Sequence, residues 1–330
     1  MKKLNIFFAV LATTVIAGCG NSGKQEEAKT TEPQASVVYM TTDISPEGLV
    51  KIYNALGVAP EGKVAVKIST GEPGGNNYLK PELIKDLVAT VNGTIVECNT
   101  AYAGRRNTSE EHWKAVKEHG FLDIAPFDLL DEEAEINIPV SDTSHIKYNI
   151  VGKNIEKYDF MVNLAHFKGH AMGGFGGVLK NQSIGLASSN GKAYIHTAGK
   201  TADKDSIWQY VKQTEQDHFI ESMAAAAKSI HDYFDGKIIY INVMNNLSVD
   251  CDCSSHPADP EMKDVGILAS TDPVALDQAC VDLIFKYPST DEDNAQPLIN
   301  RINEKHGIHI IDHAEKIGLG TKKYELVSID

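Results

Sequence analysis

The densest group of chemically capable side chains lies between Asn163 and Asn181, in the sequence NLAHFKGHAMGGFGGVLKN. Glycines let backbone N–H groups approach a ligand closely, and the lysines and histidines between them add donors, so a carboxylate or phosphate would suit this segment. The spacing matches neither a GxGxxG fingerprint nor a Walker A loop, so nucleotide binding does not follow. The alternative is a flexible loop that carries ordinary surface histidines.

Roles can be assigned to these residue types. Imidazole titrates near neutral pH, so a histidine of this segment would donate or accept a proton, while lysines would hold an anionic group. The candidates for catalysis are His166, His170, Lys168 and Asp277. The candidates for ligand binding are Lys67, Gly173, Gly174, Gly176, Gly177, Lys180, Asn181 and His196.

A second segment, CDCSSH at residues 251–256, has the residue types of a metal site. Two thiolates and an imidazole can chelate a soft metal ion, although the spacing is not that of a CxxC pair. The candidate metal ligands are Cys251, Cys253, His256 and Cys280. Two alternatives stay open for these thiols and for Cys98, namely a disulfide, as suits an exported protein, and cysteines without any ligand.

Other polar residues follow expected strands or lie on expected helices. Asp272 precedes Pro273 and is expected to cap a helix, on which Asp277 either faces the site or has a structural role. Lys67, Glu72 and the pair Arg105–Arg106 also follow strands and could share the same cleft. Three histidines near the C-terminus complete no HExxH motif, and solvated helix positions are expected for them: His306, His309 and His313.

The elements that must position these residues alternate along the chain. Strands are expected at 37–40, 63–69, 93–97, 125–129, 135–139, 147–151, 158–165, 237–243 and 265–269. Helices are expected at 45–56, 81–91, 108–119, within 206–234, and at 273–285, 297–305 and 311–317, the last of which ends the chain. This order predicts an α/β fold, a mostly parallel sheet with helices on both faces and a small β excursion around 130–157. Residues 163–181 then begin at the carboxyl end of an apolar strand, the edge where open α/β sheets bind ligands.

The first 36 residues are expected to lie outside that fold. Two lysines, a short apolar run and the sequence IAGC at 16–19 are typical of a bacterial lipoprotein signal, with Cys19 as the acyl acceptor. The alternative is an ordinary secretory signal with a chance cysteine. The polar stretch 20–36 has almost no apolar residue to bury and predicts a disordered tether. The expected organisation is therefore a signal at 1–18, a tether at 19–36 and one domain at 37–330.

Composition excludes some partners. The net charge of −14 argues against nucleic acid, because phosphate binding needs a basic patch, and against broad adhesion to anionic lipid. No later segment is long and apolar enough to cross a bilayer, so the membrane would be reached through lipid alone. The expected location is the cell envelope, on the inner or outer membrane with the domain outside the cytoplasm. A small anionic molecule is the expected partner, and the sequence names no protein partner.

The chain resembles the DUF362 family, whose uncharacterised members are often labelled Fe-S center proteins. The resemblance rests on residues 163–188, on GKAYIH at 191–196, and on CDC at 251–253 followed by DVGILASTDPVALDQACVDL at 264–283. Similar proteins carry a Lys–Asn pair that corresponds here to Lys180 and Asn181. Many relatives also contain CxxCxxC runs after the position of His196, whereas residues 197–219 contain no cysteine. Since a cubane cluster needs four such thiolates, ferredoxin-type 4Fe-4S clusters are not expected.

Two hypotheses about function follow. The first is an enzyme whose site combines the glycine-rich segment with a metal ion at the CDC segment. The second is a lipid-tethered protein that captures a small ligand or acts as a scaffold without turnover. The first requires the two segments to fold into one pocket.

Overall fold

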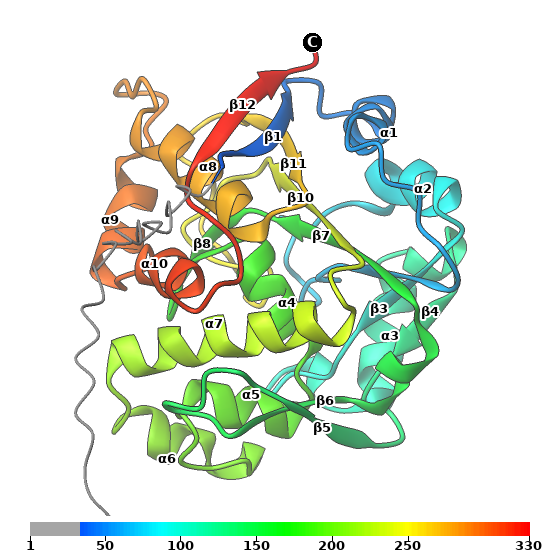
Figure 1. Cartoon of the computed structure of the whole chain (residues 1–330), viewed down its shortest axis with the longest axis vertical. Coiled ribbons are helices and arrows are strands. Elements are labelled where there is room, and N and C mark those ends of the chain that lie inside the picture. The colour runs from blue at the N-terminus through cyan, green and yellow to red at the C-terminus, as the bar shows by residue number, and fades with distance from the viewer. Residues whose placement is uncertain (1–33) are drawn as a thin grey trace, which may run out of the picture. The chain divides into compact units, whose positions relative to one another are not determined.

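An eight-stranded sheet organises the protein, as the computed structural model of residues 34–330 describes it (Figure 1). The strands run in the order β12-β1-β11-β10-β7-β2-β3-β4, and β11 is antiparallel to both its neighbours while the other five pairings are parallel. The strands are β1 (Ser36–Thr41), β2 (Val64–Lys67), β3 (Gly93–Glu97), β4 (Phe127–Leu129), β7 (Phe160–His166), β10 (Ile238–Met244), β11 (Gly266–Ser270) and β12 (Tyr324–Ser328). The mostly parallel α/β fold predicted from the sequence is confirmed.

Helices cover both faces of this sheet. They are α1 (Pro46–Ala55), α2 (Pro81–Thr90), α3 (Ser109–Glu118), α4 (Val178–Leu186), α5 (Ser189–His196), α6 (Ile207–Val211), α7 (Gln216–Tyr233), α8 (Pro273–Phe285), α9 (Gln296–Glu304) and α10 (His309–Lys316). Successive strand residues point to opposite faces, so Val64 and Val66 join the core with α1 to α3, whereas Ala65 joins the core with the later helices. Near-continuous apolar strands are the consequence of burial on both sides.

Two small sheets lie beside the main one. The hairpin of β5 (Glu135–Pro139) and β6 (Tyr148–Gly152) is the β excursion expected between residues 130 and 157. The second pairs β8 (Lys168–His170) with β9 (Gly174–Gly176), so much of the glycine-rich segment that was expected to be a loop is a short hairpin.

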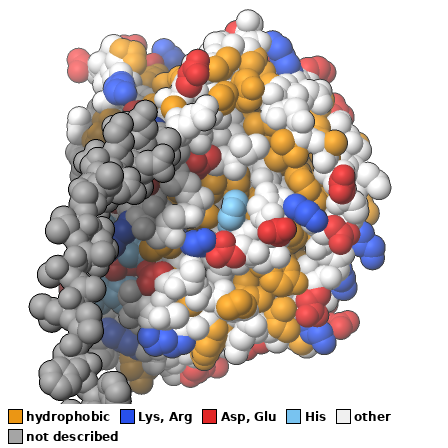
Figure 2. Space-filling view, in the orientation of Figure 1, with side chains coloured by type: hydrophobic (Ala, Val, Ile, Leu, Met, Phe, Trp, Pro, Cys, Tyr) orange, Lys and Arg blue, Asp and Glu red, His pale blue; other side chains and the backbone are white. Residues whose placement is uncertain are grey.

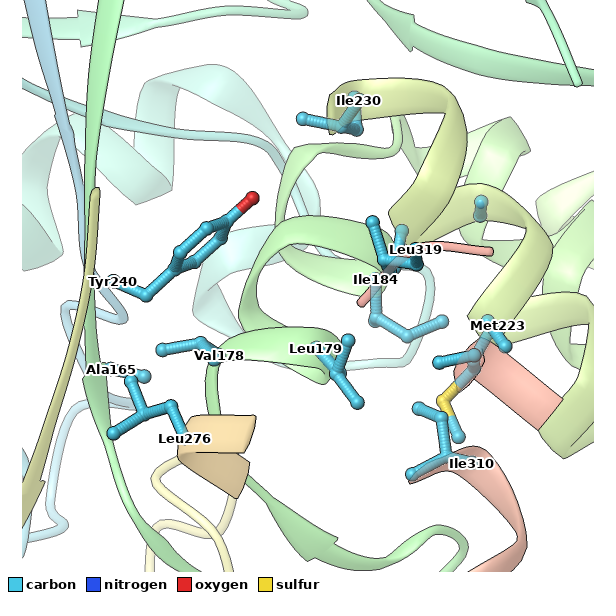
Figure 3. Packing of buried hydrophobic residues seen from close by; sticks show 14 of the residues in the cluster. Ala165, Val178, Leu179, Ile184, Met223, Ile230, Tyr240, Leu276, Ile310 and Leu319 are labelled. Atoms are coloured by element: carbon cyan, nitrogen blue, oxygen red, sulfur yellow. The ribbon is translucent and has the colours of Figure 1, made fainter. Parts of the chain in front are cut away.

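Three further elements were absent from the prediction. Helices α4 and α5 were missed because α4 is buried nearly all round, which removes the polar face that helical periodicity requires. Figure 3 shows Val178 and Leu179 of α4 between Tyr240 of the sheet and Met223 of α7. The expectation that helices end the chain was wrong, since β12 adds a half-exposed edge strand parallel to β1.

Residues 1–33, which include Cys19 and the expected signal, lie outside the described part of the chain. Among residues 34–330, no helix combines the length and the apolar character needed to cross a membrane.

Candidate functional site

A cleft of about 360 Å³ opens at the carboxyl ends of β2, β3 and β7. These strands end at Lys67, Glu97 and His166, and the remaining walls come from residues 98–106, from the β8–β9 hairpin, from α4 to α6 and from residues 251–253. The glycine-rich segment and the paired-thiol segment therefore line one pocket. The candidate residues that line it are Lys67, His166, Lys168, His170, Gly176, Gly177, Lys180, Asn181, His196, Cys251 and Cys253.

Close backbone approach explains the glycines of the hairpin. A Cβ on Gly169 would lie 2.3 Å from the carbonyl oxygen of Val249, and one on Gly177 would lie 2.3 Å from Asp277 Oδ1. Gly176 and Gly177 line the cleft. Gly174 packs instead against Gly307, and Gly173 lies in the same turn, so these two serve the shape of the hairpin.

Asp252 is the charged centre of one wall. Its side chain is 1% exposed, its Oδ1 lies 2.8 Å from His166 Nδ1, and its Oδ2 accepts from Lys168 Nζ at 2.7 Å. Although burial opposes ionisation, His166 and Lys168 hold the pKa of Asp252 below its ordinary value. His166 Nε2 also lies 2.6 Å from the carbonyl oxygen of Asn245. Since both ring nitrogens face acceptors, His166 satisfies them only as an imidazolium that donates twice.

Lys180 differs from the other lysines of the cleft. Lys67 Nζ donates to the carbonyl of Ile68 and to Asn181 Oδ1, and Lys192 Nζ donates to the carbonyl of Ala187. Within residues 34–330, the Lys180 ammonium has no hydrogen-bond or ion-pair partner. Burial and the nearby charge of Lys168 lower the pKa of Lys180 to about 7, and burial lowers that of Lys67 to about 8.

Two neutral histidines present opposite hydrogen-bonding atoms. His170 Nδ1 accepts from the backbone N–H of Gly173 at 2.8 Å, so the neutral ring carries its proton on Nε2. His196 Nδ1 lies 2.6 Å from the carbonyl oxygen of Lys192 and must donate to it, which leaves Nε2 with a free lone pair. Burial and the neighbouring cations keep both rings neutral, lowering the pKa of His196 to about 4 and that of His170 well below its ordinary value.

Buried amide and carboxylate groups fix α4, the helix that carries Lys180. Asp277 accepts from the backbone N–H groups of Val178 and Leu179, both at 3.0 Å, and from Asn242 Nδ2 at 2.7 Å. Burial raises the pKa of Asp277 to about 6, and the residue does not line the cleft. Asn181 Nδ2 donates to the carbonyl oxygen of Lys67 at 3.1 Å and to Asn163 Oδ1 at 2.7 Å. Asp277 and Asn181 thus position the helix against β2 and β7.

The four proposed metal ligands do not assemble into one group. Cys251 and Cys253 are joined as a disulfide, which was one of the alternatives left open. Cys280 is buried beside Asn242, away from the cleft, and His256 is exposed beside Ser255. In the cleft, the group that has the spacing of metal ligands is instead His170, Cys251 and Cys253, whose ligand atoms lie within 4.8 Å of one another.

Arg106 lines the cleft, as expected from its position after a strand, and is buried in ion pairs with Glu72 at 3.1 Å and Glu97 at 3.0 Å. Two other residues of the cleft, Lys192 and Trp208, were not singled out from the sequence. Lys192 belongs to the GKAYIH motif, which could have indicated it. Trp208, 51% exposed at the cleft, follows no pattern that would have drawn attention to it.

Comparison with known proteins identifies the family. The chain belongs to the family described as Domain of unknown function (DUF362), which matches residues 64–282. No curated protein matches the sequence.

Two solved structures are similar in fold. One is the lactate racemase apoprotein from Thermoanaerobacterium thermosaccharolyticum, with 15% identity, a TM-score of 0.43, and coverage of 76% of this chain and 57% of that one. The other is a protein from Thermotoga maritima, with 13% identity, a TM-score of 0.40, and coverage of 82% of this chain and 58% of that one. The chain thus spans less than three fifths of either protein, and at these TM-scores the likeness says nothing about activity.

The Asp252 cluster generates a stability prediction. Asp252→Asn would leave the buried charges of Lys168 and His166 without a counter-ion, and we expect it to lower the free energy of unfolding at pH 7 by about 3–5 kcal/mol. Because the folded-state pKa of Asp252 is lowered, its contribution is complete above about pH 4 and is lost as the pH falls further. The measurement is urea denaturation of the variant and the wild type at pH 7 and at pH 3.

Asp250→Asn is the matched control, since Asp250 is two residues away, half-buried and 3.5 Å from Arg301. We expect Asp250→Asn to lower the free energy of unfolding by less than about 1 kcal/mol. Equal costs for the two variants at pH 7 would contradict the assignment of Asp252 as the charged centre.

Proposed function

We propose that the cleft binds a small organic anion, a carboxylate or phosphate with an apolar body, and moves a proton to or from it. The observation that carries this proposal is the unpartnered ammonium of Lys180 in a cleft whose other lysines already have protein acceptors. Lys180 is half-buried in the wall of the cleft, and an anionic ligand would supply the partner that its ammonium lacks.

The charge balance of the cleft supports an anion. Five lysine or arginine side chains and the His166 imidazolium line it against two carboxylates, Glu97 and Asp252, which leaves a surplus of four positive charges when every amine is protonated. The whole protein carries −14, and Figure 2 shows acidic and basic side chains interspersed on the face in view. A local positive surplus within an acidic protein attracts small anions without promoting adhesion to nucleic acid.

Apolar side chains supply the second part of the specificity. Ala101, Ile184, Ile207 and the exposed Trp208 line the same cleft as the lysines. A ligand that stacks on Trp208 and pairs with Lys180 would bury apolar surface and satisfy the charge at once.

Proton transfer would use groups that change charge or carry a free lone pair near neutral pH. Lys180, with a pKa of about 7, can both accept and donate a proton there, and His196 Nε2 offers a lone pair. His170 Nε2–H would donate a hydrogen bond to the anion. His166 and Lys168 are engaged by Asp252 and would act as positioning residues for this wall.

A metal ion in the cleft is a second candidate, which the spacing of His170, Cys251 and Cys253 favours. It requires the reduced thiols, since a disulfide supplies no thiolate, and a proton shift on the His170 ring to free a lone pair. In protein purified with reductant and without air, we expect elemental analysis to find one metal equivalent more than in a Cys251→Ser, Cys253→Ser double variant. Metal at equal stoichiometry in both proteins would contradict this site.

We also propose that a lipid on Cys19 tethers the domain to a membrane of the cell envelope. The IAGC sequence at 16–19 and the polar stretch that follows it support this placement. We expect the full chain to incorporate an alkyne-labelled fatty acid in bacterial cells and to sediment with membranes, and Cys19→Ser to do neither. Labelling that persists in Cys19→Ser would contradict the assignment, and Cys98→Ser serves as the control.

The cleft proposal is tested by following Trp208 fluorescence in a Trp113→Phe background, where Trp208 is the only tryptophan left. We expect phenyl phosphate and benzoate to bind more tightly than inorganic phosphate and acetate, because the ring buries apolar surface. Deprotonation of Lys180 removes the attraction, so Kd should rise by up to about tenfold between pH 7 and pH 8.

Variants of Lys180 separate its charge from its size. Lys180→Met should weaken binding and flatten the pH dependence, while Lys180→Arg should keep binding nearly constant from pH 6 to pH 8. A residual fall in the affinity of Lys180→Arg near pH 8 would come from deprotonation of Lys67, whose pKa is about 8. Equal affinity in the wild type and Lys180→Met would refute the proposal.

Solvent deuterium appearing in a bound anion by NMR indicates proton transfer, and binding without it indicates simple capture.

A further inference from the structure

A cluster of histidines and carboxylates lies outside the cleft, where three distant segments meet. Glu221 comes from α7, His309 and His313 come from α10, and Asp142 and His145 come from the loop between β5 and β6. Figure 1 shows α10 next to the α7 helix, and these two helices pack against each other. His313 is 4% exposed, so the expectation that it is a solvated helix histidine was wrong.

Asp142 selects the tautomer of His313. His313 Nε2 lies 2.7 Å from Asp142 Oδ2, so the N–H group is on Nε2 and donates a hydrogen bond to that carboxylate. The other nitrogen, Nδ1, is buried and has no hydrogen-bond partner, although Glu221 Oε1 lies 3.4 Å away. In the neutral ring, a lone pair on Nδ1 therefore faces a carboxylate oxygen, an arrangement that is repulsive unless a cation lies between the two atoms.

The distances suit a metal ion. Glu221 Oε1 lies 3.0 Å from His309 Nε2 and 3.4 Å from His313 Nδ1, and the ligand atoms of all three residues lie within 4.8 Å of one another. Zinc bonds of about 2.0–2.1 Å in a tetrahedron place neighbouring ligand atoms about 3.3 Å apart. The i, i+4 spacing of His309 and His313 puts both rings on one face of α10.

The surroundings have the features of an outer coordination shell. His145 Nε2 lies 2.7 Å from Glu221 Oε2, and its ring stacks on His218 with centroids 4.3 Å apart. Asp142 Oδ2 accepts from His313 Nε2 at 2.7 Å, and Asp142 Oδ1 accepts from Ser144 Oγ at 2.6 Å. The two carboxylates, Glu221 and Asp142, would attract a divalent cation, and Asp142 would orient His313 as a ligand.

We propose that Glu221, His309 and His313 bind a divalent transition-metal ion of the zinc class, with a fourth coordination position left open. Asp142 and His145 hold two of these ligands in place. The ion ties α7 and α10 to the loop of the β5–β6 hairpin, so it stabilises this corner of the fold. None of the five residues lines the cleft, so this site is independent of anion binding there.

The experiment uses the full chain, stripped with a chelator and titrated with Zn²⁺ against a chromophoric competitor. We expect His309→Ala and Glu221→Gln to lower the affinity of one zinc equivalent by at least about 100-fold, and Asp142→Asn to lower it by about 10–100-fold. Zinc should raise the Tm of the wild type and leave that of His309→Ala unchanged. Substitution with Co²⁺ should give visible absorption bands of tetrahedral strength in the wild type and not in His309→Ala.

Two controls separate this site from others. His306→Asn alters a neighbouring exposed histidine, which pairs with Asp217 at 2.8 Å, and should leave zinc affinity unchanged. The Cys251→Ser, Cys253→Ser variant removes the thiols of the cleft and should retain the same zinc equivalent. If His309→Ala binds zinc as the wild type does, or if the wild type binds none, the proposal is overturned and a proton on His313 Nδ1 explains its contact with Glu221.

Discussion

The buried carboxylate of Asp277 fixes the helix on which the cleft depends. It accepts hydrogen bonds from the first two backbone amides of α4, so that helix begins at Val178 with its N-terminus turned into the core. Unpaired amides at this depth would each cost about 1–3 kcal/mol, and a positive helix end favours the negative charge. Two residues after Val178, Lys180 lines the cleft, and the next residue, Asn181, ties the helix to the end of β2. A residue that never touches the cleft therefore decides where its central cation lies.

The cleft itself is a balance between paired and unpaired charge. Asp252 pairs with both Lys168 and His166, and Glu97 and Glu72 both pair with Arg106, so most of the buried charge has a partner within the protein. The Lys180 ammonium has no partner because no hydrogen-bond acceptor of α4, of the β8–β9 hairpin or of the end of β2 reaches it. Such a group weakens the folded state when it stays charged and becomes useful when a ligand supplies the counter-charge. The lowered pKa is the expected response of an amine in this position.

The hydrogen-bond partner of each histidine decides which of its ring nitrogens carries a proton. In the cleft, a carboxylate makes His166 a cation, backbone amides place the proton of His170 on Nε2, and a backbone carbonyl places that of His196 on Nδ1. At the corner between α7 and α10, Asp142 fixes His313 with a bare nitrogen that faces Glu221. The same side chain thus serves as a counter-ion, a donor, an acceptor and a metal ligand, depending on what its second nitrogen meets.

The sequence by itself determined the mostly parallel α/β class and most of its strands and helices, and it predicted the edge of the sheet at which the cleft lies. These follow from local patterns of hydrophobicity and capping, such as Asp272 before Pro273 at the start of α8. It also singled out residues 163–181 by their chemical types. Only the tertiary structure decided which of those residues face the cleft, that Asp277 lies behind α4, and that Cys280 is remote from the disulfide. Contacts such as Asp252 with Lys168, or Glu221 with His309, join residues more than 80 positions apart, and no periodicity along the chain encodes such a meeting.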